Sequence, residues 1–396
     1  MNQISTLVIN CGSSSLKFAV IEPTSGQTLL SGLAERLGSS QAIVKFEYEE
    51  KKESRTPNAT DHNGALATVS QILDETGLLS GITGVGHRVV HGGELFSESM
   101  LLDDNKIEKL ETLNHLAPLH NPVNLLGIHA LKDLLPNLPQ VAVFDTAFHQ
   151  SMPEAAFLYG LPYDLYKQHG VRRYGFHGTS YRYVNQKAAE LLQLPSDDCH
   201  FLAAHLGNGC SAAAIHAGQS VDSSMGLTPL EGLIMGTRSG DIDPGMVEFL
   251  GKRLNISLTE TMAILNKQSG LLGLSGVSND MREIQQAAEQ GNEQANLALE
   301  VFAFRIARYL GSLAISLPKI SALIFTGGIG ENDRLTRSMV IDHLSLLGFK
   351  LDGALNQSNG NKIGRITTED STLAMVVKTN EELMIAQDTQ RLIQSV

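Results

Sequence analysis

Residues 7–20 read LVINCGSSSLKFAV, in which an apolar run leads into a Gly/Ser turn and an alternating run follows. This pattern predicts a strand, a tight polar turn and a second strand. Residues 201–215 read FLAAHLGNGCSAAAI and repeat the same pattern in the second half of the chain. Two such units predict two related halves, although two similar hairpins can also arise by coincidence.

Helical periodicity separates the predicted strands. Segment 299–313 places Phe302, Ile306 and Leu310 on one helical face, and residues 322–325 read as a buried strand. The charged run 47–55 is expected to be a solvated hairpin or loop. Strands that alternate with helices indicate an α/β protein.

The composition limits the functions that the chain can have. It has 396 residues, 30 Lys and Arg against 42 Asp and Glu, and a formal net charge of −12. This length predicts two or three domains. The acidic balance argues against a general binder of nucleic acid or of anionic membranes, because both require a basic surface.

We expect a cytoplasmic protein. No apolar run reaches the roughly 18 residues that a membrane span needs, and residues 1–5 show no secretory signal pattern. The three cysteines, Cys11, Cys199 and Cys210, are too few and too scattered for a disulfide framework or a zinc site. They are interpreted as small buried hydrophobic residues.

Two glycine-rich segments follow predicted strands and could bind phosphate. The turn 10–15 gathers backbone N–H groups and hydroxyls, and Lys17 adds a positive charge. It lacks the spacing of a Walker A loop, and an ordinary hairpin turn remains the alternative. The loop 326–332 lies between a buried strand and a helix, so it can present a helix N-terminus to a nucleotide or phosphate.

Two arginines are surrounded by small residues. Arg88 lies in GHRVVHGG, residues 86–93, and Arg238 lies in MGTRSG, residues 235–240. An arginine in such a setting can wait for the anion of a ligand, because burial without a partner is costly. Either arginine could instead pair with a distant aspartate.

Polar residues near strand and helix ends complete the set of candidates. Asp145 follows the apolar run 141–144, and the carboxyl ends of strands line ligand sites in α/β proteins. A helix cap is the alternative for this carboxylate. His120 and His177 lie in tight turns, and a lone histidine is more often structural than functional.

Taken together, these motifs resemble the acetate kinase family. Residues 8–18 look like its N-terminal signature, and residues 235–244, MGTRSGDIDP, look like its second signature. The segments around seven further residues match in the family's order: Arg88, His120, Asp145, His177, Asn208, Gly328 and Glu381. The resemblance extends from Leu7 to about Asp388.

The resemblance implies the fold of the acetate and sugar kinase, Hsp70 and actin superfamily. This fold has two duplicated RNase H-like α/β domains, which are actin-like ATPase domains, on either side of a nucleotide cleft. Residues 1–147 and 378–396 would form the first domain, which contains part of the acetate site. Residues 148–377 would form the second domain, which contains the nucleotide site.

The resemblance also implies an activity and its site. The family transfers the γ-phosphoryl group of ATP to acetate reversibly by in-line displacement, with Mg²⁺ or alternatively Mn²⁺, and the enzyme is implied to be a homodimer. Arg88 would bind the acetate carboxylate, Arg238 and His177 would contact the phosphoryl group, and Asp145 would be the catalytic carboxylate. Asn10 and Glu381 would position the metal. Val90, Leu119, Phe176 and Pro229 would enclose the acetate methyl group. The nucleotide would meet Lys17, His205, Leu206, Gly207, Asn208, Gly209, Asp280, Met281, Arg282, Gly328, Ile329, Gly330, Glu331 and Asn332.

The chemistry explains why positive groups dominate this implied site. Acetate is already ionised at pH 7, so phosphoryl transfer needs no strong base and needs charge stabilisation instead. A carboxylate beside the γ-phosphate would repel it. We therefore expect Asp145 to orient Arg88 or a metal-bound water.

Two alternative functions remain open. The first keeps the chemistry and changes the acid to propionate or, less readily, butyrate, because one methylene is worth only about 1–3 kcal/mol of discrimination. Val90 favours acetate if it narrows the methyl pocket. The second is an actin- or Hsp70-like ATPase switch, which would need neither Arg88 nor Arg238.

Overall fold

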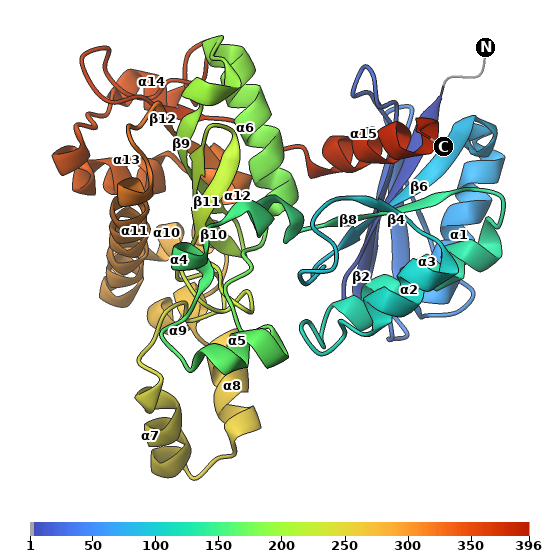
Figure 1. Cartoon of the computed structure of the whole chain (residues 1–396), viewed down its shortest axis with the longest axis horizontal. Coiled ribbons are helices and arrows are strands. Elements are labelled where there is room, and N and C mark those ends of the chain that lie inside the picture. The colour runs from blue at the N-terminus through green and yellow to red at the C-terminus, as the bar shows by residue number, and fades with distance from the viewer. Residues whose placement is uncertain (1–3, 396) are drawn as a thin grey trace. The chain divides into compact units, whose positions relative to one another are not determined.

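The computed structural model describes residues 4–395. The chain divides into two compact units. The first unit runs to Phe148 and includes the chain again from Asn380, and the second unit is His149–Thr379. Each unit contains one β-sheet (Figure 1).

The sheet of the first unit has eight strands in the order β5-β4-β3-β2-β1-β6-β8-β7. Strand β1 is antiparallel to β2 and parallel to β6, and β6 is parallel to β8. The expected solvated hairpin is formed by β4 and β5, which are joined at Glu49 and Glu50. The strands are β1 Ser5–Cys11, β2 Ser15–Ile21, β3 Thr28–Glu35, β4 Ile43–Tyr48, β5 Lys51–Arg55, β6 Ile82–Val89, β7 Met100–Leu101 and β8 Gln140–Phe144.

Helices cover both faces of this sheet because its central strands alternate buried side chains between the faces. Leu7 and Ile9 belong to a core cluster with residues of α1 (His62–Glu75) and α3 (Asn121–Leu134). Val8 belongs to a second cluster with residues of α15 (Glu381–Gln394). The last helix of the chain is therefore part of the first unit. The helix α2 spans Asp104–Glu111.

Two glycines of β6 allow α15 to lie close to the sheet. A Cβ on Gly84 would come within 2.2 Å of Ile393, and one on Gly86 would come within 2.4 Å of Thr389. Asn380 caps the helix by accepting a hydrogen bond from the backbone of Leu383. The cap thus holds the first turn of α15, and the two glycines let its later turns lie against β6.

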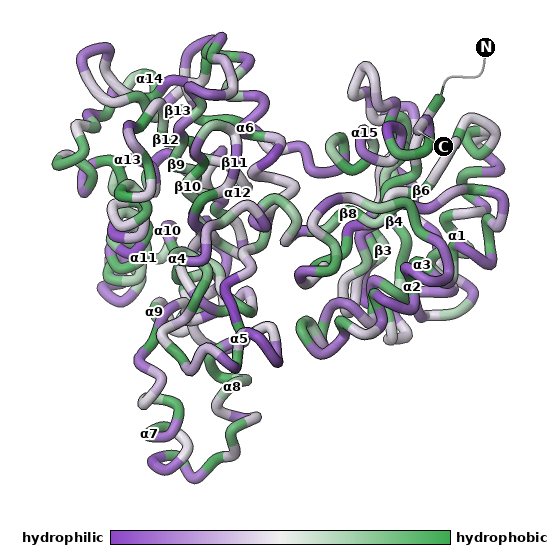
Figure 2. The backbone as a smooth tube through the Cα atoms, in the orientation of Figure 1, coloured by the Kyte–Doolittle hydropathy of each residue, from purple (hydrophilic) through white to green (hydrophobic). Residues whose placement is uncertain are grey.

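The sheet of the second unit has five strands in the order β11-β10-β9-β12-β13. The helices α6 and α11 pack against it, on opposite sides in Figure 1. The hydrophobic residues gather on central strands such as β9 (Figure 2), in which every residue is buried. The strands are β9 His200–Leu206, β10 Cys210–His216, β11 Gln219–Ser223, β12 Ala322–Thr326 and β13 Ala374–Val376.

Helices make up most of the rest of the second unit. The α-helices are α4 Glu154–Phe157, α5 Tyr163–His169, α6 Gly178–Leu192, α7 Gly245–Leu254, α8 Leu258–Lys267, α9 Gly270–Ser275, α10 Met281–Glu289, α11 Glu293–Leu313, α12 Gly327–Asn332, α13 Arg334–His343 and α14 Gly353–Gln357. Short 3₁₀ turns occupy Leu78–Gly81, Ala147–Ser151, Ser196–Asp198, Ala314–Ser316 and Ser345–Leu347. Among the described residues, no helix is long and apolar enough to cross a membrane.

The two sheets share a five-stranded plan. In the first unit, strands β3-β2-β1-β6-β8 pair as antiparallel, antiparallel, parallel and parallel. Strands β11-β10-β9-β12-β13 of the second unit repeat this order and these directions. The expected α/β class and the duplicated strand-turn-strand unit are thus confirmed. The three cysteines are free and buried, as expected.

One local expectation was wrong. Residues 326–332 were expected to form a loop, but Gly327–Asn332 is a short helix, α12. The carboxylate of Glu331 accepts the backbone N–H of Gly327, at 3.1 Å, and that of Thr379, at 3.0 Å. The Asn332 side chain donates to the Gly328 carbonyl at 2.9 Å. These tertiary and side-chain bonds outweigh the low helix propensity of three glycines.

Candidate active site

The first unit brings Asn10, Arg88 and Asp145 together at one edge of its sheet. Asn10 lies near the end of β1, Arg88 lies near the end of β6, and Asp145 follows β8, so three neighbouring strands supply them. Arg88 Nε lies 3.0 Å and 3.1 Å from the two carboxylate oxygens of Asp145, and Nη2 lies 2.6 Å from Oδ2. Arg88 Nη1 lies 3.4 Å from Asn10 Oδ1.

Arg88 does pair with a distant aspartate, Asp145. This pair leaves Nη1 outside the contact, so it does not exclude a ligand. Burial disfavours the charged form of Arg88, but Asp145, together with Glu381 and Glu382, outweighs it, so the pKa of the guanidinium is raised. Asp145 is almost fully buried, and its carboxylate holds the arginine by one edge. This geometry agrees with the expectation that Asp145 orients Arg88.

Glu381, the first residue of α15, adds a carboxylate to this cluster. Its pKa is raised to about 7, chiefly by burial; Asp145 and Glu382 also raise this pKa, whereas Arg88 and Lys17 lower it. Because these surroundings disfavour the ionised form of Glu381, a cation bound beside it would stabilise that form. Among the described residues no three His, Cys, Asp or Glu side chains are arranged to hold a metal. The amide oxygen of Asn10 and the carboxylate of Glu381 are the kinds of oxygen donor that Mg²⁺ takes, and Mg²⁺ often binds through one or two carboxylates, waters and substrate phosphates.

The other expected residues of the first unit are more dispersed. Lys17, expected near the nucleotide phosphates, forms an ion pair with Glu382 in the first turn of α15. Val90 is buried, and its backbone N–H donates to Asn124 Oδ1 at 3.0 Å. Leu119 is 68 % exposed, so the first unit by itself does not enclose this expected wall of the methyl pocket.

In the second unit, His177 and Arg238 converge on Gly209. A Cβ on Gly209 would lie 3.5 Å from His177 Nε2 and 3.8 Å from Arg238 Nη1. His177 stacks on His205, with ring centroids 4.2 Å apart. The expected signature residues around 177, 205–209 and 238 are thus neighbours in the fold.

Arg238 differs from Arg88 in its partners. Its Nη1 donates to the carbonyl of Pro229 at 3.3 Å and approaches Met235 Sδ at 3.8 Å. No carboxylate within residues 4–395 forms an ion pair with it, and burial lowers its pKa. A largely buried guanidinium without a counterion has the character of an anion site. Phe176, which precedes His177 in the chain and was expected to line the methyl pocket, is buried. Its carbonyl oxygen lies 2.9 Å from His149 Nε2.

Many of the residues that were expected to bind the nucleotide line one cavity of about 870 Å³ in the second unit. Its size falls in the usual range for small-molecule sites. The expected residues that line it are Gly207, Asn208, Asp280, Met281, Arg282, Gly328, Ile329 and Asn332. Asp280 caps α10 and forms an ion pair with Arg282 at 2.5 Å.

The other expected nucleotide residues do not line this cavity. His205 and Leu206 end the buried strand β9, and Gly209 lies beside His177 and Arg238. Gly330 is buried within α12, and Glu331 holds the start of that helix as described above. Their contribution to the cavity is to position the segments that line it.

The sequence interpretation missed several residues of the cavity. Gln285 and Glu289 line it from the same face of α10 as Met281, at intervals of four residues. Gln285 donates to Asp333 Oδ2 at 2.7 Å, and Asn279 donates to Asn208 Oδ1 at 3.0 Å. The helical spacing from Met281 was the signal that could have found two of them.

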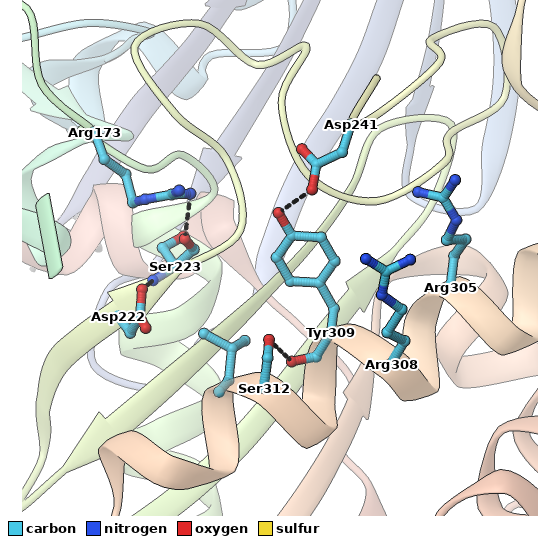
Figure 3. Close-up of a pocket in the computed structure, with 9 residues that line it drawn as sticks. Arg173, Asp222, Ser223, Asp241, Arg305, Arg308, Tyr309 and Ser312 are labelled. Atoms are coloured by element: carbon cyan, nitrogen blue, oxygen red, sulfur yellow. Dashed lines mark hydrogen bonds between the residues drawn. The ribbon is translucent and has the colours of Figure 1, made fainter. Parts of the chain in front are cut away.

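A second cavity, of about 310 Å³, lies beside α11 (Figure 3). Arg305 and Arg308 project from this helix, and Tyr309 donates to Asp241 at 2.5 Å. Arg173, on the other side, is paired with Glu231 at 2.6 Å. None of the expected site residues lines this cavity.

Comparison with known proteins agrees with this arrangement. The Acetokinase family matches residues 5–387. An acetate kinase of Chromobacterium violaceum is 51 % identical over 390 residues, 98 % of each chain. The structure of a propionate kinase from Francisella tularensis subsp. tularensis superimposes with a TM-score of 0.95 at 46 % identity, covering 98 % of this chain and all of that one. That of the Porphyromonas gingivalis acetate kinase gives 0.93 at 43 % identity, with the same coverage. Because the match extends over nearly the whole length and about half of the aligned residues are identical, the chain belongs to the acetokinase family.

Proposed function

We propose that the protein is an acetate kinase, which transfers the γ-phosphoryl group of ATP to acetate and forms acetyl phosphate and ADP reversibly. The convergence of His177 Nε2 and the uncompensated Arg238 guanidinium beside Gly209 carries the proposal. These two groups offer N–H donors to an anion at one place. Family membership supports the choice of reaction.

In the proposed reaction, an acetate oxygen attacks the γ-phosphorus and the bond to the β,γ-bridging oxygen breaks. Arg88 would bind the acetate carboxylate through Nη1, the nitrogen that Asp145 does not engage. Val90, Leu119, Phe176 and Pro229 would surround the methyl group.

Charge stabilisation is the main task of the protein in this reaction. Arg238 and His177 would donate hydrogen bonds to the transferring oxygens, on which negative charge is spread in the transition state. In related phosphoryl transfers one arginine contributes about 10³–10⁵ in kcat. Asp145 would hold Arg88 in register and would not accept a proton, since acetate is already ionised.

Asn10 and Glu381 would hold Mg²⁺, or alternatively Mn²⁺, at the edge of the first sheet. The cation would neutralise charge on the nucleotide phosphates. The pKa of Glu381 is raised to about 7, and a cation bound beside this carboxylate would favour its ionised form. We expect Glu381→Gln to raise the Mg²⁺ concentration for half-maximal activity at least about tenfold, and the exposed Glu369→Gln to leave it unchanged. Equal Mg²⁺ requirements in the two variants would remove Glu381 from the metal site.

The decisive assay mixes the protein, Mg-ATP, a short-chain acid and hydroxylamine, and measures acyl hydroxamate. Acetate should give the highest kcat/KM. A clear preference for propionate would instead assign the activity of the Francisella relative, since one methylene changes binding by only about 1–3 kcal/mol. ATP hydrolysis that ignores the acid and yields no hydroxamate would favour an ATPase switch.

We also propose a cytoplasmic homodimer, as the family resemblance implies. Light scattering coupled to size exclusion measures the mass of the particle directly. A mass near twice 42.7 kDa is expected. A mass near that of one chain would overturn the dimer and leave the proposed chemistry unaffected.

A further inference from the structure

Two buried hydroxyl groups lie behind His177. Tyr181, four residues later at the start of α6, and Ser211, on β10, are fully buried. Ser211 Oγ lies 2.8 Å from His177 Nδ1 and 2.6 Å from the Tyr181 hydroxyl. The three side chains therefore form a continuous hydrogen-bonded chain that ends on the imidazole.

Counting protons fixes the direction of this chain at Tyr181. Its hydroxyl has one proton, and the side-chain partner for it among the described residues is Ser211 Oγ. If Ser211 donated to the phenol, the tyrosine proton would have no side-chain acceptor among the described residues and would be stranded in the interior, at a cost of about 1–3 kcal/mol. Tyr181 consequently donates to Ser211.

The same count fixes the proton of Ser211. Its oxygen accepts from Tyr181, and its own proton has His177 Nδ1 as acceptor. A neutral imidazole that accepts at Nδ1 carries its proton on Nε2. The ring also stacks on His205, at an interplanar angle of 20°, so its plane is defined as well as its tautomer.

We propose that Tyr181 and Ser211 are positioning residues that hold His177 as the neutral Nε2–H tautomer, ready to donate to an oxygen of the transferring phosphoryl group. The inference rests on the proposed function for its consequence in catalysis. Nε2 is the nitrogen that faces Gly209, where Arg238 Nη1 also lies. The other tautomer would direct a lone pair at a phosphoryl oxygen and repel it.

Nitrogen-15 NMR of histidine-labelled protein tests the tautomer without any substrate. The shifts of Nδ1 and Nε2 differ between the two tautomers, and the His177→Asn variant identifies the signals of His177. The wild-type protein should show Nε2–H, and Ser211→Ala should reduce or abolish this preference. Ser220→Ala is the matched control, because it removes a buried serine that bonds to another histidine, His149, at 2.7 Å. An unchanged His177 tautomer in Ser211→Ala would overturn the proposal.

Kinetics test whether Ser211 acts through His177. We expect Ser211→Ala to lower kcat by less than the ~10²–10³-fold loss typical of removing a transition-state donor, with nearly unchanged KM values. Tyr181→Phe should act in the same direction, and Ser211→Thr, which keeps the hydroxyl, should restore kcat. In a His177→Asn background, Ser211→Ala should cause no further loss. An equal loss in both backgrounds would mean a merely structural serine.

The two measurements separate this inference from the proposed function. A protein that forms no acyl hydroxamate with any acid would contradict the proposed kinase activity. The NMR experiment would still decide the tautomer of His177. Conversely, an active kinase with the same tautomer in Ser211→Ala would retain its function and lose the positioning role.

Discussion

Arg88 binds Asp145 through its Nε edge, with Nε 3.0 Å and 3.1 Å from the two carboxylate oxygens and Nη2 2.6 Å from Oδ2. A planar guanidinium held in this way has its orientation fixed by a residue that need not touch the substrate. Arg238 has no such carboxylate among the described residues. The two arginines of the proposed reaction are therefore prepared differently: one is oriented, and the other lacks a counterion.

Asp145→Asn should lower kcat/KM for acetate by about 10²-fold or more, because the amide can no longer hold Arg88 as a charged, two-oxygen partner. KM for ATP should change much less, since the nucleotide cavity is built from residues of the second unit. Initial rates at varied acetate and ATP measure both effects. Asp74→Asn, on an exposed part of α1, is the control. A near-normal kcat/KM for acetate in Asp145→Asn would reject an essential role for this carboxylate.

Removing each arginine should affect the free energy of unfolding to a different extent. Arg88→Ala leaves the carboxylate of Asp145 buried without its partner, so the free energy of unfolding should fall by about 3–5 kcal/mol. Arg238→Ala removes a desolvated cation with no counterion, so the change should stay within about 1 kcal/mol. Urea unfolding of both variants measures this difference. A larger loss of stability in Arg238→Ala than in Arg88→Ala would show that the guanidinium of Arg238 has a structural role.

Local sequence pattern was enough to predict the fold class. The turns after residues 9 and 206 and the helix 299–313 are local signals, because strand alternation and helical periodicity act within a few residues. The short helix α12 was missed because its sequence has no local helical pattern. Six residues with three glycines show no helical signal, and the bond from Thr379 to Glu331 joins segments 48 residues apart.

The partners of the candidate residues required tertiary structure. The sequence left open whether either arginine pairs with a distant aspartate, because strand order decides that β6 and β8 are neighbours. Tyr181 shares a helical face with residue 177, which a helical spacing could suggest. Ser211 comes from a strand 34 residues away, so its contact with His177 depends on how β10 packs near α6.

The buried imidazole of His87 should make stability depend on pH. Burial lowers its pKa from 6.5 to about 4, and its Nε2 accepts a hydrogen bond from the Gln140 amide at 2.6 Å. The unfolded chain therefore binds a proton that the folded chain does not between about pH 6.5 and pH 4. The stabilising contribution is complete above pH 6.5 and is lost as the pH falls through this window, by up to about 3 kcal/mol.

His87→Gln should flatten this part of the pH profile by about one proton, whatever its effect on absolute stability. Urea unfolding at several values between pH 4 and pH 7 measures the slope. The half-exposed His129→Gln serves as control and should keep the wild-type slope. The same slope in wild type and His87→Gln would assign the acid sensitivity to other groups.

Gly209→Ala tests the space that His177 and Arg238 share. The new methyl group would lie 3.5 Å from His177 Nε2 and 3.8 Å from Arg238 Nη1, which are ordinary contact distances, so the fold should tolerate it. It would occupy the position that both donors face, so kcat should fall by at least about 10²-fold while Tm stays within a few degrees. Gly311→Ala, in α11 with open space around its Cβ position, is the matched control and should keep full activity. If Gly209→Ala is fully active, the phosphoryl group cannot pass between His177 and Arg238 as proposed, whereas a large fall in Tm would mean that Gly209 is needed for folding.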